Sequence, residues 1–230
     1  MLRAIGTVLS SAAFTACLSF VAYWSLGGRA VLSQNAAGLS VRVTDASGHG
    51  ADGAVVVVRP ESGSPPAVTV PTAPVTIGQT NERFVPLLTI IPVGGSVVFG
   101  NGDRTNHHVY SFSPLNRFEM LVPPDAVSAP VVFDRAGVLA IGCNIHDGMI
   151  AHLYVADSPW TATTDAEGRA RLDGLAPGRY KVTVWHPRLR PGRGEPEVTV
   201  DVTAAGGSAA LQLTLTPDRR RGPDRERAPY

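Results

Sequence analysis

Short runs of apolar and β-branched residues, separated by Gly, Pro and Asp, fill the chain after its first 37 residues. No stretch in this part keeps a hydrophobic period of 3.6 residues. Short apolar runs bounded by turn residues are typical of the strands of β-sandwiches and barrels. The pattern therefore predicts an all-β protein, with strands in runs such as GAVVVVRP (53–60), SVVFG (96–100), GVLAIG (137–142) and RYKVTVW (179–185).

The start of the chain has a different pattern. Arg3 is followed by an uncharged, mostly apolar run from Ala4 to Leu26, which is long enough to span a bilayer. Small residues at Ala36 and Ala37 offer a site for signal peptidase. We expect residues 1–37 to be a cleaved signal peptide, and the alternative is a retained anchor that tethers the protein through residues 4–26. Either segment predicts an exported protein, periplasmic or extracellular.

Two Pro- and Ser-containing stretches, ESGSPPAVTVPTAP (61–74) and DSPWTATTD (157–165), are candidate linkers. They bracket a central block of about ninety residues, close to the size of one small domain. From residue 217 the chain reads PDRRRGPDRERAPY, which has no apolar periodicity. We expect residues 217–230 to be a disordered, charged tail.

Composition excludes several classes of function. The 230 residues carry a formal net charge of +1, with 44% hydrophobic and 17% charged residues, so nothing favours nucleic acid as a partner. The chain has neither a G-x-S-x-G nor an H-E-x-x-H motif. It also lacks a second cysteine outside the leader for thiol exchange. We therefore expect a protein that is not an enzyme. We also expect it to be monomeric.

Candidate chemistry is concentrated in GCNIHDGM (142–149), where Cys143, His146 and Met149 are spaced three residues apart. This loop follows one predicted strand and precedes another, and GDRTNHHVY (102–110) places a further histidine at the start of a third. A lone thiol in an oxidising compartment is oxidised unless it is buried or bound to a metal. Two imidazoles, one thiolate and a weak thioether suit a copper site for electron transfer. A tetrahedral zinc site is chemically possible but has little use for Met149.

The block from residue 67 to 157 resembles the cupredoxins, the blue copper proteins of the plastocyanin and amicyanin kind. The resemblance runs through RFVPLLTIIPVGGSVVFGN (83–101), NHHVY (106–110) and the short Cys-x-x-His-x-x-Met loop, which is similar to that of amicyanin. It implies a Greek-key β-sandwich that holds one type 1 copper ion. The longer segments HHVYSFSPLNRFEM (107–120) and GCNIHDGM (142–149) are similar to those of exported cupredoxin-like proteins of the methylamine utilisation type.

Carried over by position, the resemblance implies that the copper ligands are His107, Cys143, His146 and Met149. His107 is chosen over His108 because the family's ligand stands two residues before a Val, here Val109. Neighbouring strand residues point to opposite faces, so one histidine of the pair enters the site. Three positions depart from these resemblances, all of them around the metal. His108 replaces an Asn that ties the family's ligand loops together, and Asn106 replaces a Pro. Gly148 stands where the methylamine utilisation subgroup is expected to have an aromatic residue.

The segments that flank this block resemble a carboxypeptidase regulatory-like, transthyretin-like (prealbumin-like) β-sandwich. TTDAEGRARLDGLAPGRYKVTVWHP (163–187) has that family's turns, and LSVRVTDASGHGADGAVVVVRP (39–60) has its opening strands. We therefore predict that the cupredoxin domain, 67–157, is inserted into a small sandwich made of 39–66 and 158–216. The rival arrangement has two sequential domains, with 39–60 forming the first strands of the cupredoxin.

The resemblance implies a blue copper protein that carries single electrons between redox partners, which would dock near His146. Two alternatives stay open: a module that stores or delivers copper, and an interaction module without redox use. His49, His152 and His186 have no partner at ligand spacing, and we expect them to be structural or surface residues.

Overall fold

The computed structural model describes residues 37–190, 192 and 194–217, and these residues form 16 strands and no helix. The predicted all-β class is thus confirmed. No helix in the described ranges has the length and apolar character needed to cross a membrane. The predicted leader, except for Ala37, and the predicted tail, except for Pro217, lie outside the described residues.

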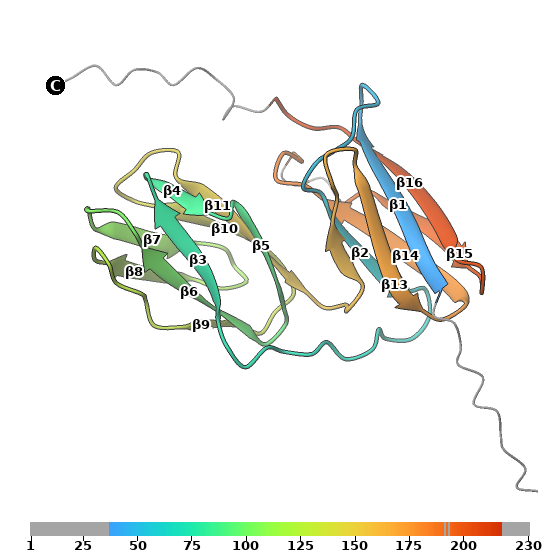
Figure 1. Cartoon of the computed structure of the whole chain (residues 1–230), viewed down its shortest axis with the longest axis horizontal. Coiled ribbons are helices and arrows are strands. Elements are labelled where there is room, and N and C mark those ends of the chain that lie inside the picture. The colour runs from blue at the N-terminus through green and yellow to red at the C-terminus, as the bar shows by residue number, and fades with distance from the viewer. Residues whose placement is uncertain (1–36, 191, 193, 218–230) are drawn as a thin grey trace, which may run out of the picture. The chain divides into compact units, whose positions relative to one another are not determined.

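Nine strands between residues 75 and 156 form two facing sheets, which we call the central sandwich. One sheet has the order β4-β3-β6-β9 and the other the order β5-β11-β10-β7-β8 (Figure 1). Their bounds are β3 Val75–Thr80, β4 Arg83–Val85, β5 Leu88–Pro92, β6 Gly95–Asn101, β7 His107–Ser111, β8 Phe118–Val122, β9 Val131–Phe133, β10 Gly137–Cys143 and β11 Ile150–Ala156.

The other seven strands form what we call the flanking sandwich, with sheets ordered β13-β1-β16 and β12-β2-β14-β15. In Figure 1 the first strand (blue) lies beside the last (red), and these two strands run parallel with Leu39 opposite Gly207. Their bounds are β1 Ala37–Asp45, β2 Val55–Pro60, β12 Thr161–Thr163, β13 Arg169–Leu175, β14 Gly178–Trp185, β15 Glu197–Val202 and β16 Gly207–Leu213.

The strand β2 shows which sandwich the segment 39–60 joins. It pairs antiparallel with β14, so Val58 lies opposite Val182 and Val55 opposite Trp185. It also pairs with β12, which follows the central sandwich in the sequence. The strands before and after residues 75–156 therefore share both sheets of the flanking sandwich.

Each sandwich has its own core because its strands alternate buried and exposed side chains. In β1, Leu39, Val41 and Val43 are buried whereas Ser40 and Arg42 are exposed. The run of four valines in β2 does not alternate because both of its faces are covered. Val56 and Val58 belong to the core of the flanking sandwich, while Val55 and Val57 pack with Tyr154 of β11.

The two candidate linkers differ from each other. Residues 61–74 form no strand and are largely exposed, as a linker should be. Residues 157–165, in contrast, contain β12, and Ser158 and Thr164 are buried. The Ser158 hydroxyl donates to the carbonyl of Val58 on β2, and the Thr164 hydroxyl accepts from the N–H of Ala54. The polar composition that predicted a linker here reflects hydroxyl groups that bond to the backbone of a neighbouring strand.

We predict that Gly168→Ala destabilises the protein far more than Gly48→Ala. Both glycines have positive φ, +75° and +85°, so alanine costs about 1–2 kcal/mol of conformational strain at either site. A Cβ at Gly168 would in addition lie 2.0 Å from the carbonyl oxygen of Val43, whereas one at Gly48 meets nothing within 4 Å. Urea denaturation of the two variants measures the difference, and equal losses would contradict this account of the turn.

Candidate metal centre

The strand β7 places one histidine of the His107-His108 pair inside the central sandwich. The alternation of the strand buries His107, Val109 and Ser111 completely, and His108 points to the other face, where it is partly exposed. Two residues of β7 pair with β10, Tyr110 with Gly142 and Val109 with Cys143. This pairing brings the start of β7 beside the end of β10, so His107 lies close to the Cys143 loop.

The loop from Asn144 to Met149 is closed by its own backbone. The N–H of Cys143 donates to the carbonyl of Met149 at 3.2 Å, and the N–H of Met149 donates to the carbonyl of His146 at 3.3 Å. Gly148 has a φ of +81°, and a Cβ there would meet nothing within 4 Å. Glycine replaces the aromatic residue of the resembled family at a position where the backbone, rather than lack of space, disfavours a side chain.

Three potential ligand atoms, from Cys143, His146 and His107 of β7, lie close together. The Sγ of Cys143 lies 3.6 Å from Nδ1 of His107 and 3.6 Å from Nδ1 of His146. All three donor atoms lie within 4.8 Å of one another, and the two imidazole rings are 4.9 Å apart between centroids. Cys143 and His107 are buried, and the His146 side chain is 11% exposed.

The outer nitrogen of His107 is held by a carboxylate. Nε2 of His107 lies 2.9 Å from Oδ2 of Asp103. Burial raises the pKa of Asp103, but hydrogen bonds from the Glu82 N–H, from His107 and from the Asn81 N–H outweigh it, and the net pKa is lowered. An ionised carboxylate only accepts, so Nε2 of His107 is placed to donate to it, and the neutral ring with this proton on Nε2 has its lone pair on Nδ1, facing Cys143.

His146 has a similar, longer contact on its outer side. Its Nε2 lies 3.6 Å from Oε1 of Glu82. A proton on Nε2 would face this carboxylate, and the neutral ring with that proton has its lone pair on Nδ1, on the side of Cys143. A single thiol proton satisfies at most one of the two imidazole nitrogens. The cluster is therefore an electron-rich pocket, which a bound cation would stabilise.

The spacing of the donor atoms fits one metal ion. An ion bonded to a thiolate at about 2.3 Å and to an imidazole at about 2.0–2.1 Å holds the two donor atoms roughly 3.6–3.8 Å apart at angles of about 110–120°. Both sulfur-to-nitrogen distances, 3.6 Å, fall in this range. Both sulfur-to-nitrogen distances are thus those that one copper or zinc ion would require.

Met149 lies at the end of the same loop. It is 3% exposed and belongs with Cys143 to the core cluster of the central sandwich. The structure therefore brings together the four residues that the sequence predicted: His107, Cys143 and His146 through their donor atoms, and Met149 through the loop backbone and the shared core.

His108 replaces the asparagine of the resembled family, and the tie between the ligand loops is made differently. The N–H of Asn144 donates to the carbonyl of His108 at 3.0 Å, and the Asn144 side chain lies 3.4 Å from Nδ1 of His108. On its other side, Nε2 of His108 lies 2.9 Å from Oε1 of Glu119. The amide group that links the two loops thus comes from the residue after Cys143.

Sequence reasoning missed three residues that organise this site: Asn101, Asp103 and Glu82. The buried Asn101 side chain donates to the carbonyls of Thr105 and Val122 and accepts from the N–H of Asp103. It fixes the turn that leads into β7. A usable signal was the Asn-Gly-Asp triplet at 101–103, which ends four residues before His107.

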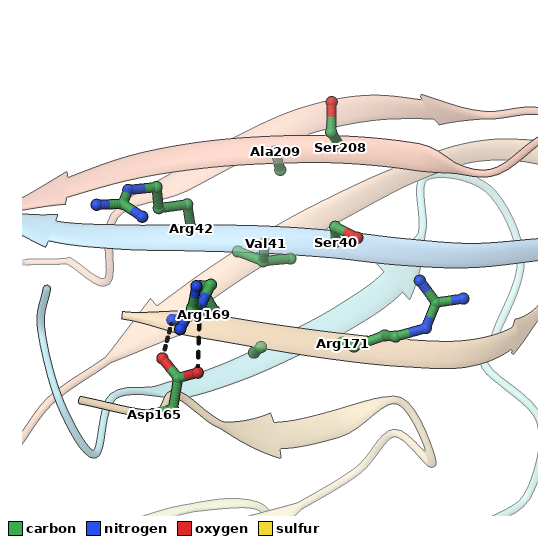
Figure 2. Close-up of a pocket in the computed structure, with 9 residues that line it drawn as sticks. Ser40, Val41, Arg42, Asp165, Arg169, Arg171, Ser208 and Ala209 are labelled. Carbon is green, nitrogen blue, oxygen red and sulfur yellow. Dashed lines mark hydrogen bonds and ion pairs between the residues drawn. The ribbon is translucent and has the colours of Figure 1, made fainter. Parts of the chain in front are cut away.

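The described residues hold one further hollow of note, on the exposed face of the β13-β1-β16 sheet. Figure 2 shows Arg42, Arg169 and Arg171 around it, with Asp165 bonded to Arg169. Arg171 is likewise paired with Asp173. These arginines are exposed, and two of them have carboxylate partners in β13 or in the turn before it. The hollow is a solvated surface rather than a built binding site.

Comparison with known proteins gives solved structures only, since no family model and no curated protein sequence matches the chain. A purple cupredoxin from Nitrosopumilus maritimus is 23% identical, with 36% of this chain and 99% of that chain covered and a TM-score of 0.32. Amicyanin from Paracoccus versutus is 22% identical over 43% of this chain and 97% of that chain, with a TM-score of 0.34.

A copper-containing nitrite reductase from Thermus scotoductus is also similar. It is 22% identical over 43% of this chain and 25% of that chain, with a TM-score of 0.35. The structural neighbours are thus cupredoxins and a copper enzyme, at low identity and partial coverage. The function of this chain has to be inferred from its own donor atoms.

We predict that Asn101→Leu lowers the free energy of unfolding by about 3 kcal/mol, because three hydrogen bonds of about 1 kcal/mol each are lost in a buried site. Asn116→Leu is the matched control, since the Asn116 amide makes one exposed hydrogen bond, to the carbonyl of Val132. Urea denaturation of the copper-free protein measures both. Equal small losses would show that Asn101 does not hold the turn.

Proposed function

We propose that this protein is a type 1 copper protein that carries single electrons between redox partners and has no catalytic turnover of its own. The observation that supports this most is the convergence of one buried thiol and two imidazole nitrogens, with a buried methionine closing the same loop. Copper bound there would supply a one-electron couple between Cu(I) and Cu(II).

The residues would divide the work as follows. His107, Cys143 and His146 would hold the ion through Nδ1, Sγ and Nδ1, and Met149 would be a weak fourth ligand. Soft sulfur favours Cu(I) and imidazole serves both oxidation states, so this mixed set accepts either without exchanging ligands. The loop hydrogen bonds and the burial of His107 keep the donor atoms in place, which limits rearrangement when the charge changes.

His146 is the ligand that we expect to exchange electrons with partners. His107 is fully buried, whereas the His146 side chain retains 11% exposure. The neighbouring Ile145 is 55% exposed. Redox partner proteins would dock on the surface around His146, Asp147 and Gly148. With a net charge of +1, nothing in the chain favours nucleic acid as a partner.

The site suits copper better than zinc. It also suits electron transfer better than delivery of copper to another protein. Zinc makes no use of a buried methionine at the loop end. Delivery of copper requires a site that is open to a recipient, whereas Cys143 and Met149 are 7% and 3% exposed. A non-redox interaction module would need no convergent donor set at all.

The wider assignments are proposals of the same kind. We propose that the central sandwich is a cupredoxin domain of the exported, methylamine utilisation type, inserted into a transthyretin-like module. The pairing of β2 with β14 supports the insertion. We also propose that the protein is exported and monomeric. A single cysteine among the described residues, buried beside two histidines, suits an oxidising compartment.

The central experiment adds Cu(II) to the full chain and records visible absorption and EPR spectra. We expect an intense thiolate-to-copper band in the red and a narrow copper hyperfine splitting, both absent in Cys143→Ser. His107→Ala should abolish the band as well, whereas His108→Ala should keep it, because His108 points to the other face of β7.

Three results would decide against parts of the proposal. A colourless protein that binds Zn(II) would favour the zinc alternative. A blue protein that gives up Cu(I) at once to a chelator would favour delivery. A band that survives His107→Ala but is lost in His108→Ala would show that the ligand register is wrong.

A further inference from the structure

A carboxylate faces the outer nitrogen of each candidate ligand histidine: Asp103 at His107 and Glu82 at His146. The two carboxylates come from different turns, yet they are linked. Oδ1 of Asp103 accepts the N–H of Asn81 at 2.6 Å, and Oδ2 accepts the N–H of Glu82 at 3.0 Å. A single carboxylate thus holds both His107 and the turn that carries Glu82.

The turn itself is strained, and its sequence departs from what its geometry prefers. Thr80 pairs with Arg83, so Asn81 and Glu82 are the two loop residues of the β3–β4 hairpin. Both have positive φ, 52° and 55°. Two-residue hairpin turns of this kind strongly prefer Asn-Gly. Asparagine stands at the first position as expected, but a glutamate occupies the second, where glycine is favoured.

A strained residue persists where its surroundings hold it and where it serves a purpose. The hydrogen bonds that both turn N–H groups donate to the Asp103 carboxylate hold the turn in place. The side chain at the strained position places its carboxylate 3.6 Å from Nε2 of His146. Glycine, which suits the backbone better, would remove this carboxylate.

We propose that Asp103 and Glu82 are positioning residues that fix the outer nitrogens of both candidate ligand histidines and favour the oxidised over the reduced copper ion. This inference rests on the proposed function. Carboxylates on the outer nitrogens make the imidazoles stronger donors. Two negative charges beside the ligands also stabilise Cu(II) more than Cu(I), because Cu(II) carries one more positive charge.

The first test does not involve copper. In the copper-free full chain, 15N NMR should show His107 with its proton on Nε2, protected from exchange. Asp103→Asn should weaken that protection, because one amide oxygen cannot serve the three N–H groups that the two carboxylate oxygens accept. Glu119→Gln is the matched control: it removes a carboxylate 2.9 Å from the non-ligand His108. It should leave the His107 signal unchanged.

The second test measures Cu(II) and Cu(I) affinities of the same variants and of Glu82→Gln. We expect Asp103→Asn to weaken Cu(II) binding about 10–100-fold, as for other outer partners of metal ligands. Cu(I) binding should weaken less, and each tenfold difference between the two losses raises the reduction potential by about 59 mV. Glu82→Gln should act in the same direction with a smaller effect, because its contact is longer.

A last variant, Glu82→Gly, separates positioning from a merely structural role. Glycine relieves the positive φ, so the urea midpoint of the copper-free protein should not fall, while the potential should rise as in Glu82→Gln. A fall in the midpoint with no change in potential would overturn the role of Glu82. If Glu119→Gln raises the potential as much as Asp103→Asn, the carboxylates do not act through the ligands and the proposal is wrong.

The two proposals fail in different ways. If the wild-type protein binds no copper but the His107 proton is protected and Asp103-dependent, the proposed function fails while the positioning of His107 stands. If copper binds with the blue spectrum and no variant changes the Cu(II) to Cu(I) ratio, the function stands and the positioning proposal fails.

Discussion

The contact of the buried Cys143 Sγ with two imidazole nitrogens is the constraint around which the central sandwich is arranged. Polar groups inside a core are costly unless they are paired, and three lone-pair donors that face one another are not paired by hydrogen bonds alone. Such a cluster is stable only where backbone and side-chain bonds keep it together or where a cation joins it. The structure supplies the first, through the β7–β10 pairing and the closed loop, and the donor spacing fits the second.

The residues around the donor atoms hold one another in place, one after the next. The Asn101 amide fixes the backbone of Asp103, whose carboxylate fixes the His107 ring and the turn that presents Glu82 to His146. Since both histidines depend on these contacts, the two halves of the donor set are coupled through Asp103, although one comes from β7 and the other from the Cys143 loop.

The sequence predicted the fold class well because β-sandwich strands have a strong local signal: alternation in β1 and turn residues between runs. The four-residue valine run was also correctly interpreted as strand, but its two-sided burial is visible only in three dimensions. The loop spacing and the resemblance pointed to Cys143, His146 and Met149. The alternation of β7 explains why His107 and not His108 faces them. Asp103 and Glu82 were missed because carboxylates near turns are common, and only the tertiary fold brings them to the histidines.

The interrupted order of the flanking sandwich has a consequence for folding. Its strands β2 and β12 are neighbours in one sheet but about a hundred residues apart in the sequence, so pairing them first would close a long loop. The strands of the central sandwich, in contrast, all pair among themselves between residues 75 and 156. Once these strands have paired, the loop that β2 and β12 must close is effectively shorter. The hydrogen bonds of Arg59 with Asp157, and of Ser158 with Val58, join the points where the chain leaves and re-enters the flanking sandwich. On this reasoning the central sandwich, which contains the candidate metal centre, orders first, and closure of the flanking sandwich follows.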